Sequence, residues 1–293
     1  MKSILEFKNI SKNYASIKAL KDVSFSIPEN SIFGILGANG SGKSTFMKIL
    51  PGLIYNWSGE IYYHGKIISK QSMLLKKDFG YLIESPTFYE YLSAKKNLDI
   101  LARISNVDSS KINYVLDLVD LTERSNDKVQ TYSYGMKQRL GIAQTLLHDP
   151  KVVILDEPNN GLDPNGIDDM IRIIKQLKSE GKTICLSTHN LKDVEEVCTD
   201  FTIFKKGNNS KSTSMKQQIE DSNRWLLSVK DHDQALDRIK TNESFKIISN
   251  FNNNILIESK SNNTVEDITS TLKGLQIYKI NKESNLIKYF KND

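Results

Sequence analysis

Cysteine is scarce in this 293-residue chain, which contains only Cys185 and Cys198. Their spacing matches neither a disulfide framework nor a metal site, so we expect two reduced core thiols in an intracellular protein. Long apolar runs are also missing, because none approaches the roughly 18 to 20 residues needed to cross a bilayer. The first residues lack the apolar stretch of a signal peptide. These absences argue against a secreted or membrane-spanning protein and predict a cytoplasmic chain.

Blocks of like charge are missing as well. The chain carries 40 Lys and Arg against 35 Asp and Glu, and its net charge of +5 is spread along the sequence. A nucleic-acid arm would concentrate its basic residues, so the charge pattern does not predict such a partner. Hydrophobic residues at 39% and charged residues at 26% are ordinary for a folded protein, which we expect to form one medium domain and a smaller one.

The order of the hydrophobic patterns predicts the fold class. Apolar and alternating runs between residues 4 and 36 predict short strands, the last of which enters a glycine-rich loop. Helical patterns dominate between residues 93 and 149, and apolar strands return in the runs VVIL and TICLSTH. Alternation of strands and helices predicts an α/β fold with a mainly parallel sheet.

A second unit is expected near the C-terminus. The amino-acid composition becomes polar after Lys205. We therefore expect a linker over residues 208–222 and a small α+β accessory domain over 223–293. The patterns of this domain run strand, helix, strand, strand, helix, strand, an order that suits a split βαβ sandwich. It has no group of titratable residues typical of catalysis, so we expect it to support binding or dimerisation.

The glycine-rich run at residues 37–45 fits the phosphate-loop pattern G-x-x-x-x-G-K-[ST] and stands between a predicted strand and a predicted helix. Its three glycines allow backbone N–H groups to approach phosphate oxygens. Lys43 would bridge the β- and γ-phosphates, and Ser44 would offer its hydroxyl to Mg²⁺. The alternative, a glycine loop without nucleotide, is disfavoured by the flanking elements. The residues assigned to nucleotide binding here are Gly37, Ala38, Asn39, Gly40, Ser41, Gly42, Lys43, Ser44 and Thr45.

Two more segments point to phosphate chemistry. The apolar run ILDEP ends in Asp156, which could hold Mg²⁺ through water, and in Glu157, which could orient or deprotonate the water attacking the γ-phosphorus. An Asp-Glu pair alone is usually only solvated, so its value comes from following the phosphate loop. Earlier in the chain, Ser133 and Gly135 open an amphipathic pattern, and the N-terminus of such a helix suits an anion.

These motifs together resemble the nucleotide-binding subunit of an ATP-binding-cassette (ABC) transporter, over residues 4–207. In that family a signature usually written LSGGQ joins the phosphate loop to the Asp-Glu strand. YSYGM stands in its place here, where Ser133 and Gly135 match and three positions depart. The resemblance implies an ABC ATPase domain over residues 1–207, with an N-terminal antiparallel β subdomain and a helical subdomain at about 85–150.

The resemblance assigns further residues. Asp163, in the run NGLD, stands in the place of the D-loop, and His189 in that of the switch histidine, which would contact the γ-phosphate and sense its loss. Tyr14 occupies the position of an aromatic ring stacked on adenine, a task that needs a flat face. The alternatives are a structural histidine and a packing tyrosine.

Glu84 is the main departure, because the family normally has glutamine there. An ionised glutamate can accept from a Mg²⁺-bound water, but it cannot donate to a phosphate oxygen, and it adds negative charge. A drifted loop residue is the alternative. With its IESP context and the YSYGM signature, the chain resembles the bacitracin-resistance, lantibiotic self-protection and multidrug export branch of ABC transporters. Phe88, Tyr89 and Tyr91 could line a groove for the membrane subunit or pack in the core.

The resemblance implies a motor that hydrolyses ATP with Mg²⁺. One chain would supply Lys43 and Glu157 to one ATP, and Ser133 to the ATP of a second cassette, so we expect a homodimer. A separately encoded transmembrane permease would dock on it at the inner face of the cell membrane and export an antimicrobial peptide or drug. No nucleic acid is expected. The expected catalytic residues are Glu157, His189 and Lys43, and the expected metal ligands are Ser44, Asp156 and Glu84.

Two other functions fit part of the sequence. A soluble ABC ATPase could clamp a non-membrane partner such as nucleic acid or a ribosome, but such proteins tend to carry paired cassettes or coiled-coil insertions, and the sequence has neither internal repeats nor heptads. A regulator that binds ATP without hydrolysing it is disfavoured by the presence of Glu157.

Overall fold

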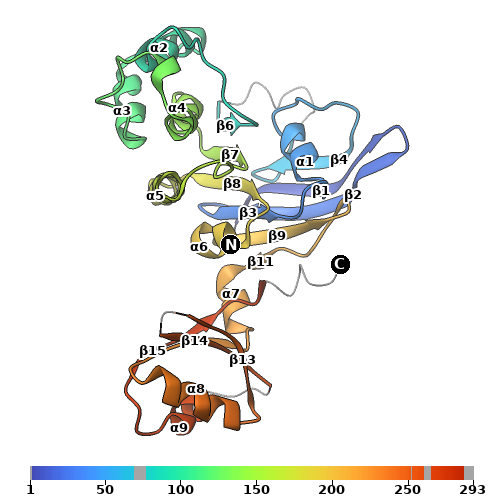
Figure 1. Cartoon of the computed structure of the whole chain (residues 1–293). Helices are drawn as coiled ribbons and strands as arrows, with labels where there is room; N and C mark the ends of the chain where they lie inside the picture. The colour runs from blue at the N-terminus through green and yellow to red at the C-terminus, as the bar shows by residue number, and fades with distance from the viewer. Residues whose placement is uncertain (1, 69–76, 252, 261–264, 287–293) are drawn as a thin grey trace. The chain divides into compact units, whose positions relative to one another are not determined.

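The computed structural model describes residues 2–68, 77–251, 253–260 and 265–286 (Figure 1). The chain divides into two compact units, Met1–Ser212 and Thr213–Asp293. Residues 208–222, where we expected a linker, span the boundary between these units and contain short elements: β10 (Asn208–Asn209), β11 (Thr213–Ser214) and α7 (Met215–Glu220). The polar side chains that indicated a loop form specific hydrogen bonds. Asn209 bonds the backbone of Ser24, and Ser214 caps α7 by accepting from the N–H of Gln217.

The first unit contains an antiparallel sheet and a mainly parallel one. The antiparallel sheet has the order β2-β1-β4-β5, and the central sheet has the order β10-β9-β3-β8-β7-β6. Within the central sheet, β9, β3, β8, β7 and β6 pair in parallel, and β10 pairs antiparallel with β9. The strands are β1 (Ser3–Tyr14), β2 (Ile17–Pro28), β3 (Ile32–Leu36), β4 (Ser58–Tyr63), β5 (Lys66–Ile67), β6 (Phe79–Leu82), β7 (Val152–Asp156), β8 (Thr183–Thr188) and β9 (Asp200–Lys205).

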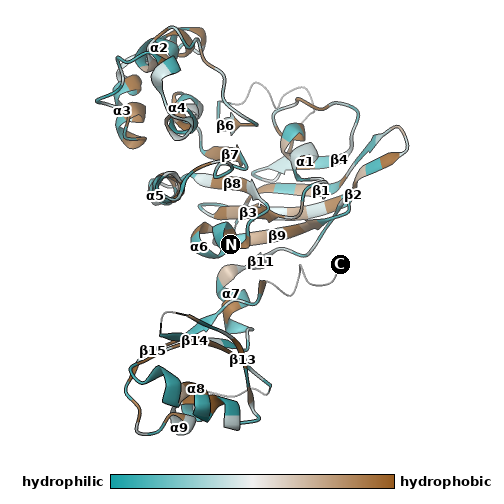
Figure 2. Ribbon diagram, viewed as in Figure 1, coloured by the Kyte–Doolittle hydropathy of each residue, from teal (hydrophilic) through white to brown (hydrophobic). Residues whose placement is uncertain are grey.

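Burial explains why the central strands lack an alternating pattern. Every residue of β3 and of β8 is buried, as parallel strands covered on both faces require. In Figure 2 the central strands carry much of the apolar colour. The carboxyl ends of these parallel strands meet at one edge of the sheet, where the loops that follow β3, β6, β7 and β8 carry the predicted site residues.

Aromatic packing anchors the first helix, α1 (Lys43–Ile49), to both sheets. The ring of Phe46 lies 4.9 Å from that of Phe7, 5.2 Å from Phe25 and 5.5 Å from Phe204, measured between centroids. Phe25 also stacks on Phe33 at 5.3 Å. Such contacts contribute about 0.5–1.5 kcal/mol each beyond burial. They fix the helix that follows the phosphate loop.

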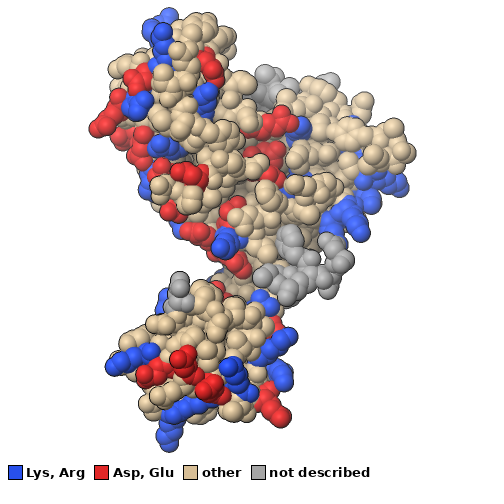
Figure 3. Space-filling model, viewed as in Figure 1, with Lys and Arg blue, Asp and Glu red and all other residues tan. Residues whose placement is uncertain are grey.

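Helices α2, α3 and α4 form a group of their own in Figure 1. Side-chain caps begin two of them, because Ser93 accepts from the N–H of Lys96 and Ser133 accepts from that of Met136. Lys, Arg, Asp and Glu all lie on the visible face of this group (Figure 3). In the part of the chain that the structure describes, no helix combines the length and apolarity of a membrane span. The helices are α2 (Ala94–Ile104), α3 (Ser110–Leu118), α4 (Tyr134–Leu146), α5 (Pro164–Ser179) and α6 (Leu191–Val197), with a 3₁₀ turn at Val129–Thr131.

The second unit is a split βαβ sandwich. Its sheet has the order β13-β14-β12-β15 with antiparallel pairing throughout, and two helices, α8 and α9, cover one face (Figure 1). Its core includes Leu227, Ile255 and Ile257 from the sheet, and Ile239 and Ile268 from the helices. This topology confirms the predicted α+β fold. The elements are β12 (Arg224–Val229), α8 (His232–Thr241), β13 (Phe245–Phe251), β14 (Asn254–Ser259), α9 (Val265–Thr271) and β15 (Ile277–Glu283).

Candidate functional site

The phosphate loop requires glycine at defined positions. Gly42 has a φ of 110°, and a Cβ atom there would lie 2.7 Å from the carbonyl oxygen of Ala19. Gly37 is closed in as well, since a Cβ would lie 2.5 Å from the carbonyl oxygen of Phe204. Only glycine combines this backbone with so close an approach, so the loop shape is fixed by the sequence.

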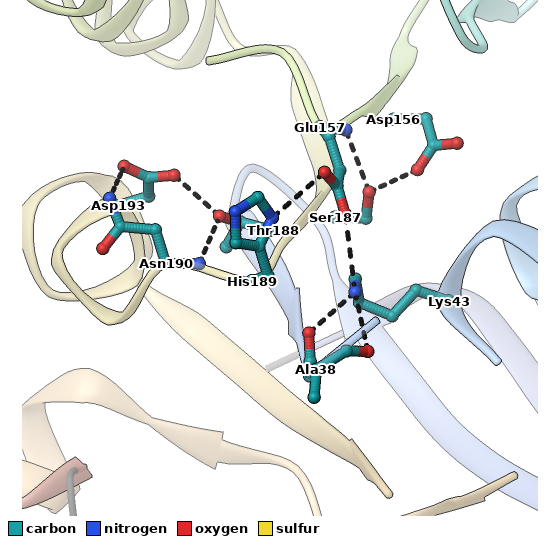
Figure 4. A network of polar contacts seen from close by, with 10 residues as sticks. Ala38, Lys43, Asp156, Glu157, Ser187, Thr188, His189, Asn190 and Asp193 are labelled. Carbon is teal, nitrogen blue, oxygen red and sulfur yellow. Dashed lines mark hydrogen bonds and ion pairs between the residues drawn. The ribbon is translucent and has the colours of Figure 1, made fainter. Parts of the chain in front are cut away.

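Lys43 holds the loop from inside. Its side chain is only 3% exposed, and Nζ donates to the carbonyl oxygens of Gly37 at 2.7 Å and Ala38 at 3.2 Å (Figure 4). The hydroxyl oxygen of Ser41 is buried and has no hydrogen-bond partner among the described residues. A buried ammonium and an unsatisfied hydroxyl within a glycine loop fit an anionic group such as a phosphate.

A cavity of about 380 Å³ opens beside this loop. Among its lining residues are Asn39, Gly40, Gly42, Lys43, Ser44, Thr45 and Glu157, all of them predicted site residues. Lys18, Lys21 and Lys206 also line it, together with Ile17. The sequence did not single out these four residues, because they belong to no motif. With Lys43, four lysines line this cavity and give it the positive charge that binding of a nucleoside triphosphate requires.

Tyr14 is not among the residues that line this cavity. Its side chain is 45% exposed, and Lys12 Nζ lies 4.7 Å from the centre of its ring. The ring of Tyr14 therefore has an exposed surface on which a base could stack. The large apolar side chain that lines the cavity itself is that of Ile17. Stacking of Tyr14 on a base remains a prediction.

Ser187 on β8 contacts both acidic residues at the end of β7, one through its carboxylate and the other through its backbone. Its hydroxyl donates to Asp156 Oδ1 at 2.5 Å and accepts from the backbone N–H of Glu157 at 2.9 Å. The parallel register sets this contact, because Asp156 pairs with Ser187. Burial raises the pKa of Asp156, although the Ser187 hydrogen bond and the charges of Lys43 and Lys48 oppose the shift. Spacing along the sequence gave no sign of this role of Ser187.

Glu157 lies between a lysine and a histidine (Figure 4). Its Oε1 is 3.5 Å from Lys43 Nζ, and its Oε2 is 3.0 Å from His189 Nδ1. The three side chains come from the loops or helix that follow β3, β7 and β8, which are neighbours in the sheet. A carboxylate in this place can accept a proton from a water molecule while the lysine offsets its charge.

A buried network shapes the turn that carries His189. Asp193 is 7% exposed; its Oδ2 accepts from the hydroxyl of Thr188 at 2.7 Å, and its Oδ1 accepts from Asn190 Nδ2 at 3.2 Å. The backbone N–H of Asn190 donates to Thr188 Oγ1 at 3.0 Å, which closes the turn (Figure 4). These three residues and His189 line a second cavity of about 200 Å³, beside Glu157.

Comparison with known proteins decides the family. A family model described as ABC transporter matches residues 20–160. The lantibiotic transport ATP-binding protein SrtF of Streptococcus pyogenes is 41% identical to the chain over 201 residues, which covers 69% of this chain and 86% of that protein. The chain belongs to the ABC transporter family.

Other ABC proteins agree with this assignment. The bacitracin transport ATP-binding protein BcrA of Bacillus licheniformis is 39% identical over 209 residues, or 71% of this chain and 68% of that protein. Among solved structures, cbiO1 from Clostridium perfringens, part of the ABC transporter complex cbiONQ, superposes with a TM-score of 0.69 at 26% identity and covers 75% of this chain and 92% of its own. The predicted family, fold class and ATPase class are confirmed, and the chain is an ATP-binding subunit of a transporter.

The ABC signature and the D-loop stand apart from these contacts. Ser133 is the N-cap of α4, and Asp163 is the N-cap of α5, where its carboxylate accepts from the N–H of Gly166 at 3.0 Å. Within the described residues, neither lines the 380 Å³ cavity or forms one of the hydrogen bonds or ion pairs of Lys43 and Glu157 given above. A Cβ atom at Gly135 would meet only Leu162, at an ordinary 3.6 Å. Packing inside the chain therefore does not require glycine at this signature position.

Glu84, the departure from the ABC pattern, follows β6 and adopts a positive φ of 62°. Its side chain is 67% exposed and forms an ion pair with Lys48, in the last turn of α1. The hydrogen bond from Lys48 to Glu84 raises the pKa of the lysine, against the effect of burial. Glu84 does not line the 380 Å³ cavity. The ABC fold thus places this glutamate against α1, beside the site rather than within its cavity.

Proposed function

We propose that this chain is the motor subunit of an ABC exporter, which binds ATP, dimerises on it and hydrolyses it to drive a separate transmembrane subunit. The observation that carries the proposal is the position of Glu157, whose carboxylate lies between Lys43 and His189 at the mouth of the phosphate loop. General-base assistance needs a carboxylate within reach of the attacking water. Glu157 acts as that base.

Each neighbouring residue has a task in this reaction. Lys43 and the loop N–H groups bind the β- and γ-phosphates, and His189 hydrogen-bonds the γ-phosphate. Ser187 orients the carboxylate of Asp156 and holds the backbone of Glu157. Ser44 and Asp156 would hold Mg²⁺, and Glu84 could accept a hydrogen bond from a water molecule of that ion. When bound, Mg²⁺ neutralises charge on the phosphates.

A second cassette completes the site. Ser133 and Gly135 begin helix α4, whose N–H groups suit an anion, and the space at Gly135 is not taken up by the chain itself. We assign Ser133 and Gly135 to the ATP that is held by the partner in a homodimer. Asp163 has the same assignment. The dimer then closes when the γ-phosphate bridges both cassettes, and it opens once hydrolysis removes that bridge.

Similarity to proteins named for lantibiotic and bacitracin transport supports an antimicrobial peptide, or a drug of similar character, as the transported substrate. The chain would work in the cytoplasm, attached to the inner face of the membrane through its permease. Phe88, Tyr89 and Tyr91 follow Glu84, and the side chains of Tyr89 and Tyr91 are exposed, as contact with that permease would require.

The test is ATP hydrolysis by Glu157→Gln beside the parent chain. Glutamine keeps the shape of the side chain but cannot take the proton, so we expect at least about a 100-fold lower rate of phosphate release with nucleotide affinity retained. Equal rates would defeat the assignment. Fractionation tests the transport part: recovery in membranes should depend on a co-expressed integral membrane protein, and recovery with ribosomes would contradict export.

A further inference from the structure

Helix α1 carries two lysines that meet two different glutamates. Lys43, its first residue, lies 3.5 Å from Glu157, and Lys48, in its last turn, forms an ion pair with Glu84. Glu157 follows β7 and Glu84 follows β6, and these two strands are neighbours in the sheet. One short helix thus contacts the segments that leave two adjacent strands.

The two glutamates hold equivalent positions in the sheet. Leu82 of β6 pairs with Leu155 of β7 in parallel register, and each glutamate lies two residues beyond this pair, after its strand has ended. Both have a positive φ, 62° at Glu84 and 46° at Glu157. This backbone is uncommon for a glutamate, so the surrounding structure and not residue preference sets the backbone turn at both positions.

Charge explains why a second lysine is needed. Glu84, Asp156 and Glu157 bring three carboxylates to one edge of the sheet, and a glutamate in place of the usual glutamine contributes one of them. Lys48 supplies the opposite charge, and its pKa is raised first by its hydrogen bond with Glu84 and further by the charges of Glu84 and Asp156. Like charges left without such a partner would repel one another.

We propose that Lys48 is the positioning residue for Glu84, which it holds against the last turn of α1 so that the segment after β6 is tied to the helix that follows the phosphate loop. The inference rests on the proposed function, in which this segment passes hydrolysis to the membrane subunit. Lys48 is 32% exposed and Glu84 is 67% exposed, so solvent weakens their attraction. A weak contact of this kind can open when the segment moves.

The test measures hydrogen exchange of backbone amides in the full-length, nucleotide-free chain. Lys48→Met should raise the exchange of residues 84–92 by about two- to fourfold, because the segment loses its ion pair. Lys48→Arg should restore the parental rate, and high salt should reduce the difference between Lys48→Met and the parent. Lys175→Met, which changes an exposed lysine of α5, is the matched control and should leave this segment unaffected.

A double variant makes the inference specific to the pair. If Lys48 acts through Glu84, Lys48→Met combined with Glu84→Gln should exchange as fast as Glu84→Gln alone. Additive effects, or parental exchange in Lys48→Met, would overturn the inference. The ATPase comparison of Glu157→Gln with the parent is independent of this readout. Failure of the proposed function and failure of the Lys48 inference therefore appear in different experiments.

Discussion

His189 and Glu157 lie 3.0 Å apart, from Nδ1 of the ring to Oε2 of the carboxylate. One residue follows β8 and the other follows β7, so their contact depends on these strands being neighbours. An N–H at Nδ1 can donate to the carboxylate and so restricts where the carboxylate can point. The first prediction follows from this pair.

Replacing His189 by alanine should slow ATP hydrolysis by about tenfold to a hundredfold, the effect of losing one hydrogen bond to a charged group. Nucleotide affinity should change much less, because the phosphate loop is untouched. Steady-state phosphate release and binding of a fluorescent nucleotide measure the two effects. His64→Ala, in the turn after β4, is the control. An unchanged rate in His189→Ala would show that this histidine is structural.

The stability of the folded chain should depend on pH through the carboxyl group of Asp156. Burial raises the pKa of this carboxyl in the folded chain above its value of 3.8 in an unfolded chain. The folded state therefore binds the proton more tightly, and the parent loses stability as pH rises through the range between these two values. Asp156→Asn carries no such charge and can still accept from Ser187.

In the presence of a metal chelator, Asp156→Asn should melt at a higher temperature than the parent at pH 7. This difference should shrink as the pH is lowered towards 3.8, where the parental carboxyl becomes protonated in both states. Asp168→Asn alters an exposed carboxylate of α5 and should show no such trend. A difference in melting temperature that does not change with pH would indicate that packing, and not ionisation, makes Asp156→Asn more stable than the parent.

Asp193→Ala should disturb the turn that carries His189. Removing the carboxylate leaves the buried hydroxyl of Thr188 without its acceptor, at a cost of about 1–3 kcal/mol in the free energy of unfolding, and it also removes a partner of the exposed Asn190 amide. Because His189 then loses its support, ATP hydrolysis should fall several-fold at temperatures where the chain remains folded. Urea unfolding and phosphate release measure the two effects. Loss of stability without loss of rate would separate this network from the site.

Gly42→Ala should abolish nucleotide binding. The added methyl group would lie 2.7 Å from the backbone oxygen of Ala19, on a residue whose φ of 110° already excludes other side chains. Gly65→Ala provides the comparison, since its φ is 73° but no atom lies within 4 Å of an added Cβ. That variant should bind nucleotide normally and lose only about 1–2 kcal/mol of stability, the cost of a left-handed backbone. Binding by Gly42→Ala would mean that the loop adjusts.

The parts of the site that lie close together in the sequence could be predicted from it. The phosphate loop is continuous, and its glycines, Lys43 and Ser44 follow from one pattern. Asp156 and Glu157 were recognisable because an apolar strand must end where its polar residues begin. The split βαβ order of the second unit could also be predicted, since its six elements alternate clearly in hydropathy.

Contacts between distant residues could not be predicted. Ser187 meets Asp156 only because β8 pairs with β7, and Lys48 meets Glu84 only because β6 occupies the edge of the sheet beyond β7. No local spacing encodes this strand order. The polar composition of residues 208–222 did not predict the short strands and the helix found there, because short polar side chains serve as helix caps and strand-edge donors as readily as they form loops.

The phenylalanine cluster around Phe46 has a mechanical consequence. Its rings come from β1, β2, β3, α1 and β9, so α1 cannot shift against either sheet without separating several aromatic contacts at once. The phosphate loop and α1, with Lys43 and Lys48, are therefore expected to stay fixed against the sheets of the first unit. Displacements produced by the nucleotide are expected in the segments after β6 and β8, where Glu84 and His189 are held by few bonds and lie nearer to solvent.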